Sequence, residues 1–335
     1  MKKVAHVLWR SHGGIRRHVH YVATHPPSGW ATSAVFGPSE LAGLFSDAPF
    51  YATSIGGVLR LAPDADVVHA HGFTAGLCAL RPLRPPVVTT LHVVVGSSGR
   101  TASSPFSRAV ANVALTRADA LIAPSAAAAR SYPRARVMAP ASEPLAVPRL
   151  SRGEVRADLD APADATVVVT VARLDRDKRL DVFIRAVEGS NSIGWIVGDG
   201  PERARLEELA VGTRVRLLGH REDIADILFA ADLFALPSAS ESYGIAIAEA
   251  LEAGLPVVAT DTGAHAELIG GAGVVVAPDD HEGFIAAVKR LVHDEVVRSS
   301  LASAARGRRR PDPDALIAEL GAVYDELDGR RRARA

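Results

Sequence analysis

The chain has 335 residues, of which 48% are hydrophobic and 23% are charged; this composition excludes a disordered protein and predicts two globular domains of roughly 150 residues each. Lysine plus arginine and aspartate plus glutamate both number 38, so the formal net charge is zero, which disfavours a nucleic-acid partner. The single cysteine, Cys78, excludes an internal disulfide framework and a thiolate zinc site.

Two further absences in the sequence bear on location. The first residues, from Met1 to Arg10, lack the long apolar core of a signal peptide. No apolar stretch reaches the roughly 18 residues that cross a bilayer. Together with the lone cysteine, these features lead us to expect a cytoplasmic protein.

Short β-branched segments alternate with alanine- and leucine-rich stretches along the chain, which is the α/β pattern of parallel sheets covered by helices. In the first half we expect strands at Val4–Trp9, Thr32–Phe36, Asp66–His69, Val87–Leu91 and Ala120–Ala123. In the second half we expect strands at Thr166–Ala172, Ile193–Val197, Arg214–Leu218, Leu233–Leu236, Pro256–Ala259 and Gly273–Val276. Their continuous apolar character is typical of strands buried on both faces.

The two strand series are separated by a stretch rich in proline, where neither helical nor strand periodicity persists. We therefore predict an N-terminal domain over residues 1–145, a linker over 146–165 and a C-terminal domain over 166–310. The remaining residues, 311–335, carry helically spaced apolar residues from about 314 to 327, followed by a basic tail. This helix should pack, with the N-terminal domain as one candidate surface.

The most specific stretch, Pro237–Ala259, reads as a strand end, a turn, a helix starting near Ser242 or Tyr243, a glycine stop and another strand. Glu241 lies just before this helix and Glu249 lies eight residues further on, so both carboxylates lean to one side, up to about 12 Å apart. An arbitrary glutamate pair is more often solvated or a helix-dipole partner. Here the apolar neighbours of Glu249 demand a polar partner, such as the hydroxyl pair of a ribose.

The start of the same helix is suited to phosphate. Free backbone N–H groups around Tyr243 to Ile245 and the helix dipole both favour an anion. Gly244 lets the backbone approach a ligand closely. The stretch therefore combines two carboxylates with an anion-binding turn, as a sugar diphosphate nucleoside requires.

This stretch resembles the retaining glycosyltransferases of family 4, which place a Glu-x7-Glu motif in the same strand, turn and helix. The resemblance continues through Leu217–Asp223, Ala231–Leu233, Val257–Asp261 and Gly263–Glu267. It implies a GT-B fold, in which two Rossmann-like doubly wound domains face a central cleft. It also implies a retaining, metal-independent transfer of a hexose-type sugar from a UDP- or GDP-sugar to a hydroxyl of a glycan, glycolipid or small molecule.

The resemblance also implies roles for individual residues. Glu241 would contact hydroxyls of the transferred sugar and Glu249 the ribose. Arg173 and Lys178 would bind the diphosphate, supplying the positive charge that a metal supplies elsewhere. Arg179 stands where relatives often have glycine, so this loop departs from the family pattern at that position.

Two glycine-containing loops complete the predicted donor site. Gly198 begins a Gly-Asp-Gly-Pro segment that similar enzymes place near the nucleobase, with Arg221 beside it; a dinucleotide fingerprint is disfavoured because Arg203 replaces its third glycine. Gly14 opens a helix after the first strand, and the resemblance places it at the donor phosphates. The predicted donor-binding set is Gly14, Arg173, Lys178, Gly198, Arg221, Glu241, Ser242, Tyr243, Gly244, Ile245 and Glu249.

Histidines gather at two strand ends of the first half. His69, His71 and His92 raise the alternative of zinc, but no further ligand and no supporting partner are readable, so we expect no metal and no cofactor. His92 ends a strand that resembles the family strand whose terminal histidine contacts the transferred sugar, and His71 is a weaker second candidate. His18 and His20 are expected to be surface or packing residues. The predicted catalytic set is His92, Glu241, Arg173 and Lys178.

Other functions stay open at this stage. A GT-B relative such as a nucleotide-sugar epimerase or a phosphorylase shares the fold, and so would a catalytically silent nucleotide-sugar-binding protein. The arginine clusters Arg306–Arg310 and Arg330–Arg334 are expected to be solvated; the alternative is peripheral contact with the anionic inner face of a membrane.

Overall fold

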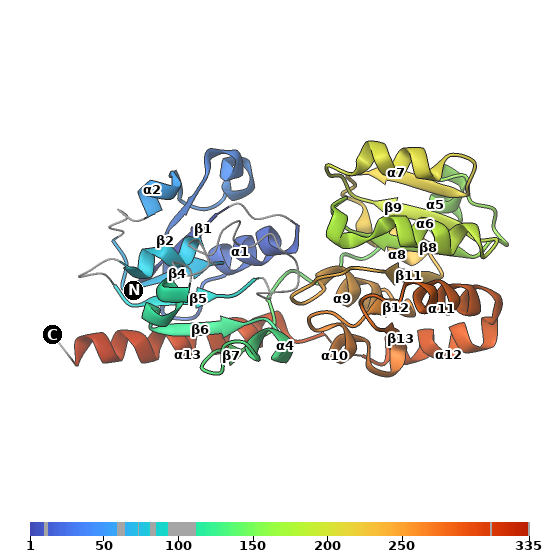
Figure 1. The fold of residues 1–335 in the computed structure, drawn as a ribbon. Coiled ribbons are helices and arrows are strands. Elements are labelled where there is room, and N and C mark those ends of the chain that lie inside the picture. Colours follow the sequence, from blue (N-terminus) through green and yellow to red (C-terminus); the bar gives the residue numbers. More distant parts are fainter. Residues whose placement is uncertain are drawn as a thin grey trace. The chain divides into compact units, whose positions relative to one another are not determined.

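The computed structural model describes residues 1–9, 13–58, 64–72, 74–80, 85–92, 112–308 and 310–333 (Figure 1). The chain divides into two compact units. Unit 1 comprises Met1–Glu143 together with Pro311–Ala335, and unit 2 comprises Pro144–Arg310. Each unit contains one parallel sheet with helices on it, which confirms the α/β class.

Among the described residues, unit 1 has a seven-stranded parallel sheet in the order β3-β2-β1-β4-β5-β6-β7. The strands are β1 (Lys2–Leu8), β2 (Trp30–Gly37), β3 (Phe50–Ala52), β4 (Val67–His71), β5 (Val87–Thr90), β6 (Ala120–Ala123) and β7 (Arg136–Val137). The five predicted strands are present. The edge strands β3 and β7 were not predicted, because they are short and largely exposed and so lack an apolar run.

Unit 2 has a six-stranded parallel sheet in the order β10-β9-β8-β11-β12-β13. Its strands, all six predicted, are β8 (Val167–Val171), β9 (Ile193–Val197), β10 (Val215–Gly219), β11 (Leu233–Leu236), β12 (Val257–Thr260) and β13 (Gly273–Val276). Alternate residues of β8 feed different cores: Val167 and Val169 lie in one apolar cluster and Val168 in the other. Helices therefore cover both faces of this sheet.

The helices of unit 1 are α1 (Gly14–Thr24), η1 (Ser39–Phe45), α2 (Ile55–Val58), η2 (Ala75–Leu80), α4 (Ala126–Ala129) and α13 (Pro313–Arg332). Those of unit 2 are α5 (Arg152–Asp158), η3 (Arg176–Lys178), α6 (Leu180–Glu188), α7 (Arg203–Ala210), α8 (Ile224–Ala230), α9 (Ile245–Glu252), α10 (His265–Ile269), η4 (Gly270–Ala272), α11 (His281–His293) and α12 (Glu295–Arg306).

The segment predicted as a linker, residues 146–165, belongs to unit 2 in the structure. It carries helix α5, which opens with a capping box between Ser151 and Glu154. Arg156 of this helix is buried and donates hydrogen bonds to the carbonyl oxygen of Ala230 at 3.0 Å and to Asp232 at 2.6 Å. The proline content of this segment is typical of a linker, but these buried polar contacts attach the segment to unit 2.

The last helix, α13, packs on the sheet of unit 1. Its apolar face, including Leu320 and Tyr324, shares a core cluster with Val4 and Trp30. The helix extends past the predicted end at residue 327, because arginines of the expected basic tail are held by acidic partners: Arg331 contacts Asp66 and Asp328. None of the helices in the described part of the chain is long and apolar enough to cross a membrane.

Candidate functional site

The order of the strands in unit 2 defines a switch point between β8 and β11. The chain proceeds from β8 to β9 and β10 on one side and from β11 to β12 and β13 on the other. Loops that leave such a pair of strands diverge, and ligands of open α/β sheets bind in the crevice between them. Lys178 follows β8 and Glu241 follows β11, so this crevice holds two of the predicted catalytic residues.

The two side chains form an ion pair in this crevice. Nζ of Lys178 lies 2.6 Å from Oε1 of Glu241 and 3.6 Å from a carboxylate oxygen of Asp177. Burial lowers the pKa of Lys178, but the two carboxylates outweigh this effect, so the pKa is raised overall. Burial alone would raise the pKa of Glu241, yet Lys178 and His265 hold it below its usual value. The crevice therefore holds a fully charged pair, mostly shielded from water.

Helix α9 begins at Ile245, two to three residues later than predicted. The reason is Gly244, whose φ of 104° is left-handed and ends the turn before the helix. No side chain caps this end, so the free N–H groups belong to the turn starting at Ile245. Glu249 lies on the same helix with only 3% of its surface exposed.

The glycine loops of unit 2 pack tightly against their neighbours. Gly198 has a φ of 133°, and a Cβ atom there would lie 2.0 Å from the carbonyl oxygen of Ala172. Gly263 is also close to the turn at Glu241, where a Cβ would meet the carbonyl oxygen of Glu241 at 2.5 Å. Gly198 therefore lets the loop after β9 approach the loop after β8, and Gly263 lets the loop after β12 approach the loop after β11.

The predicted arginines of unit 2 are partly exposed. Arg173 is 39% exposed at its side chain and pairs with Asp175 at 3.0 Å. Arg221 makes a two-pronged contact with Asp223, which raises the pKa of the guanidinium. Both arginines are therefore held by an acidic neighbour close in sequence.

His265 was not singled out from the sequence. It is fully buried at the start of α10, and its Nδ1 donates to the carbonyl oxygen of Thr260 at 2.8 Å. Its Nε2 is consequently unprotonated in the neutral ring and has no hydrogen-bond partner among the described residues. A Cβ added to Gly244 would lie 3.0 Å from this nitrogen, so the imidazole packs against the start of α9.

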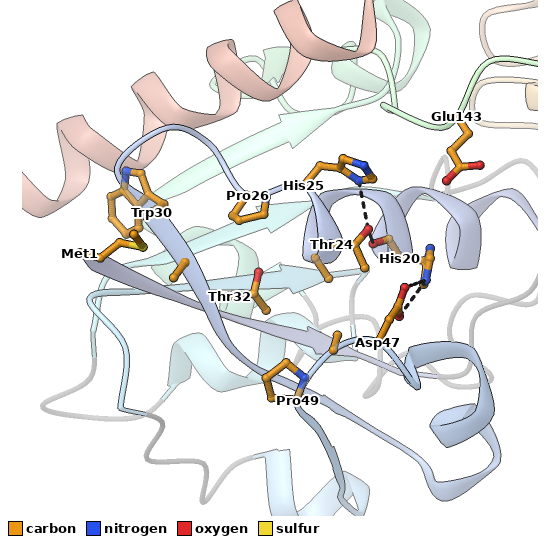
Figure 2. A pocket seen from close by; sticks show the side chains of 13 residues that line it. Met1, His20, Thr24, His25, Pro26, Trp30, Thr32, Asp47, Pro49 and Glu143 are labelled. Atoms are coloured by element: carbon orange, nitrogen blue, oxygen red, sulfur yellow. Dashed lines mark hydrogen bonds and ion pairs between the residues drawn. The ribbon is translucent and has the colours of Figure 1, made fainter.

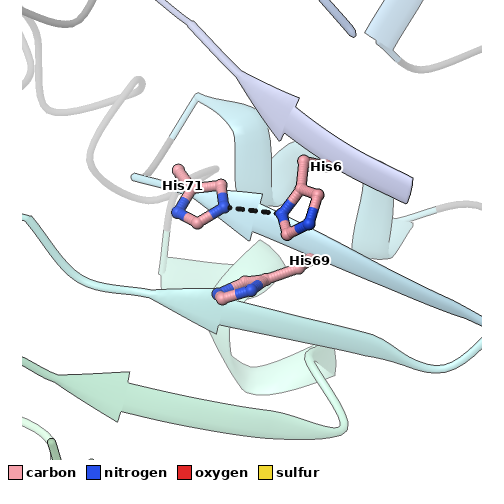
Figure 3. Close-up of side chains that lie close together, drawn as sticks. All are labelled: His6, His69 and His71. Atoms are coloured by element: carbon pink, nitrogen blue, oxygen red, sulfur yellow. Dashed lines mark hydrogen bonds between the residues drawn. The ribbon is translucent and has the colours of Figure 1, made fainter. Parts of the chain in front are cut away.

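Unit 1 contains a cluster of five buried histidines, which we call the histidine cluster: His6, His18, His69, His71 and His92. Nδ1 of His6 lies 3.2 Å from Nε2 of His71 (Figure 3), and Nδ1 of His71 lies 3.3 Å from Nε2 of His92. His18 was expected at the surface or in packing; it is buried and bonded to the carbonyl oxygen of Ala141 at 2.9 Å.

The histidine cluster meets a geometric condition that the sequence did not reveal. His6, His69 and His71 each bring one ring nitrogen within 4.8 Å of the others, and His18, His71 and His92 do the same. His6 and His18 therefore bring further ring nitrogens beside the strand-end histidines, which could not be read from the sequence. His6 was missed because only the parallel register of β1 with β4 places it opposite His69.

Unit 1 also holds the predicted residue Gly14 and, apart from it, a hollow. Gly14 opens α1 after Gly13, whose φ of 52° is left-handed and which has no capping side chain. A separate hollow of about 710 Å³, shown in Figure 2, is lined by 13 residues around the end of α1 and the start of β2, including an ion pair of His20 with Asp47. None of the predicted site residues is among those 13.

Each unit of the chain matches a family model of glycosyltransferases. Residues 12–142 match the family model "Glycosyltransferase Family 4", and residues 165–294 match the model "Glycosyl transferases group 1". The chain is 37% identical over 154 residues to the lipopolysaccharide core biosynthesis glycosyltransferase LpsE of Rhizobium meliloti, covering 44% of this chain and 45% of LpsE. It is 28% identical over 278 residues to the D-inositol 3-phosphate glycosyltransferase of Mycobacterium leprae, covering 71% and 65% of the two chains.

Solved structures show a fold likeness over nearly the whole chain. HepE of Anabaena, solved in complex with UDP, superposes with a TM-score of 0.84 at 22% identity, covering 97% of this chain and 100% of HepE. WaaG, a glycosyltransferase involved in lipopolysaccharide biosynthesis, gives a TM-score of 0.73 at 20% identity, covering 96% and 99%. The fold is therefore GT-B, with two Rossmann-like units. The chain spans only about 45% of the length of LpsE.

Proposed function

Both units of this chain match glycosyltransferase family models, and from this premise we propose that it transfers a sugar from a nucleotide diphosphate donor to an acceptor hydroxyl. The donor is a UDP- or GDP-sugar of the hexose type, and the acceptor is a glycan, a glycolipid or a small molecule. HepE was solved with UDP and with UDP-glucose, which makes UDP-glucose the first donor to test.

The observation that carries this proposal is the ion pair of Lys178 with Glu241 at the switch point of unit 2. A diphosphate competes with the single carboxylate for the ammonium, because it brings more negative charge and more acceptor oxygens. Once Lys178 turns to the diphosphate, the Glu241 carboxylate is available to accept hydrogen bonds from hydroxyls of the sugar. Donor binding would therefore exchange one ion pair for two sets of contacts, without leaving a buried charge alone.

The same arrangement serves the transfer step. Negative charge builds on the diphosphate as it departs, and Lys178 with Arg173 stabilises that charge. This assigns to two side chains the part that a metal plays elsewhere, so the transfer is metal-independent. The acceptor hydroxyl attacks the anomeric carbon from the face that the diphosphate leaves, and a donor phosphate oxygen takes the proton, which retains the configuration.

The remaining donor contacts come from the start and the interior of α9. Its uncapped first turn offers N–H groups to the phosphates. Glu249, about 6 Å further along the helix axis, accepts from the ribose hydroxyls. In unit 1, Gly14 approaches the donor phosphates and His92 contacts the transferred sugar.

The first experiment measures thermal stabilisation of the purified protein by UDP, UDP-glucose, GDP and GDP-mannose, each in the presence of EDTA. A ligand at 100 times its Kd stabilises the folded state by about 2.7 kcal/mol. We expect one nucleotide series to stabilise the protein and Lys178→Ala to abolish that shift. Lys289→Ala, on α11, is the matched control and should keep it.

Turnover separates the transferase from its rivals. With a competent acceptor, nucleoside diphosphate release should require that acceptor, and Lys178→Ala should slow the release by roughly 100-fold or more. An epimerase would convert the donor without releasing the nucleotide, a phosphorylase would require inorganic phosphate, and a silent binding protein would only be stabilised. Near-normal turnover in a folded Lys178→Ala variant would overturn the assignment.

A further inference from the structure

A row of three imidazoles crosses the sheet of unit 1. His6 lies on β1, His71 at the end of β4, and His92 just after β5. Their exposed fractions rise from 0% through 2% to 7% along the row, so its buried end is His6 and its outer end is His92. The two nitrogen-to-nitrogen distances, 3.2 Å and 3.3 Å, are those of hydrogen bonds.

Every ring in this row is neutral at pH 7. Burial lowers the pKa of His6 to about 3 and that of His71 and His92 well below the usual value. Repulsion from neighbouring histidines makes a smaller contribution to these low pKa values. A neutral imidazole has one N–H and one bare nitrogen, so each ring in the row donates on one side and accepts on the other. The direction of one hydrogen bond therefore fixes the direction of the other.

The buried end of the row decides this direction. Nε2 of His6 is buried and has no hydrogen-bond partner among the described residues. If the row ran from His92 inward, this atom would be a buried N–H without an acceptor, a group that native proteins rarely tolerate. If the row runs outward from His6, the atom is only an unused lone pair. The second arrangement leaves His71 donating to His92.

We propose that His71 is a positioning residue: its Nδ1–H donates to Nε2 of His92 and holds His92 as the tautomer with its proton on Nδ1. Because Nε2 is engaged by His71, only Nδ1 of His92 can meet a ligand, and it meets that ligand as a donor. Resting on the function proposed above, this means that His92 donates to an oxygen of the transferred sugar and does not act as a base.

A metal ion is the competing explanation of these distances, since two imidazoles on one zinc ion, with bonds of about 2.0–2.1 Å, place their nitrogens at a similar spacing. Two observations favour hydrogen bonds between the imidazoles over a shared metal ion. Both nitrogens of His69 already bond hydroxyl groups, those of Tyr324 and Thr90, at 2.7 Å each, so His69 has no nitrogen left for an ion shared with His6 and His71. In addition, among the described residues no Asp or Glu belongs to either group of clustered ring nitrogens, so a dication there would lack a compensating charge.

The test is nitrogen-15 NMR of the histidine side chains of the full chain at pH 7.5 with EDTA, with His92 assigned by the loss of its signals in His92→Gln. We expect His92 to carry its proton on Nδ1. The tautomer with the proton on Nε2 would overturn the proposal. Replacing EDTA with zinc chloride should leave the His71 and His92 signals in place; stoichiometric zinc binding that shifts them would also overturn it.

Two variants examine His71 itself. His71→Phe removes the donor, so His92 should shift toward the Nε2–H tautomer, and kcat/KM for the donor should fall roughly threefold to tenfold, the equivalent of one hydrogen bond. His6→Phe is the matched control, because His71 then ends the row with its own lone pair and still donates to His92. If His71→Phe and His6→Phe change the tautomer of His92 to the same extent, the proposed role of His71 is contradicted. The NMR readout needs no substrate, so it stands even where the proposed transferase activity fails.

Discussion

Lowering the pH from 7.5 to 5.5 should destabilise unit 1 through the histidine cluster. The folded-state pKa of His6 is about 3 and that of His18 about 4, whereas an unfolded histidine titrates near about 6.5. The other three members are lowered well below the usual value. The unfolded chain therefore binds more protons than the folded chain in this range. The stability that the neutral cluster contributes is complete above about pH 6.5 and is lost as the pH falls toward the pKa values of the folded state.

The size of the effect follows from the pKa difference. Each histidine that must stay neutral costs about 1.4 kcal/mol for every pH unit below the unfolded pKa. At pH 5.5 His6 and His18 together cost about 3 kcal/mol, a large part of the roughly 5–15 kcal/mol stability of a typical domain, and the three other members add to this cost. Unit 1 should therefore open at an acidity that leaves most domains folded.

Hydrogen exchange read by mass spectrometry measures this opening unit by unit, at pH 7.5, 6.5 and 5.5, after correction for the intrinsic exchange rate. His18→Asn keeps an N–H group near the Ala141 carbonyl and removes one titrating group, so the pH slope should fall by about 1.4 kcal/mol per pH unit. His220→Gln changes an exposed histidine of unit 2 and should leave the slope of unit 1 unchanged. A stability of unit 1 that stays flat down to pH 5.5 would refute the reasoning.

Two further predictions concern packing. Gly198→Ala forces a Cβ to 2.0 Å from a carbonyl oxygen at a φ of 133°, so it should lower the free energy of unfolding by about 3 kcal/mol or more. The control Gly212→Ala has a φ of 78° but open space around the new Cβ, and should lower it by about 1 kcal/mol. Equal losses of the two variants in urea titrations would contradict the steric argument. Tyr324→Phe leaves Nδ1 of His69 without its hydroxyl partner and should lower the free energy of unfolding by about 1–3 kcal/mol. Tyr51→Phe, at an exposed site, is the control and should lower it little. An unchanged unfolding midpoint for Tyr324→Phe would show that this hydrogen bond does not stabilise the fold.

The buried strands could be predicted from the sequence because burial on both faces leaves a direct mark, a continuous apolar run such as Val167–Val171. The edge strand Phe50–Ala52 carries no such mark, since only its pairing with β2 makes it a strand. The start of α9 was predicted too early because the helix signal of the apolar run was weighed without the left-handed conformation that Gly244 adopts. Local patterns thus predicted elements better than their ends.

The site required information that local patterns do not hold. Lys178 and Glu241 are 63 residues apart, and their contact depends on β8 lying next to β11, which is a property of the strand order. The motif indicated that each residue serves a donor, but not that the two are paired with each other. His6 shows the same limit, because its contact with His71 bridges 65 residues through the register of parallel strands.

The path of the chain through unit 1 has a consequence for synthesis. The unit is built from two separate segments, and Tyr324 of α13 contacts His69, which was made 255 residues earlier. On the ribosome, the first segment emerges with the partner of its histidine cluster still missing, while unit 2 emerges as one continuous segment. Although unit 1 is encoded first, it can close its core only after α13 has left the exit tunnel, whereas all of unit 2 has been synthesised before α13 begins.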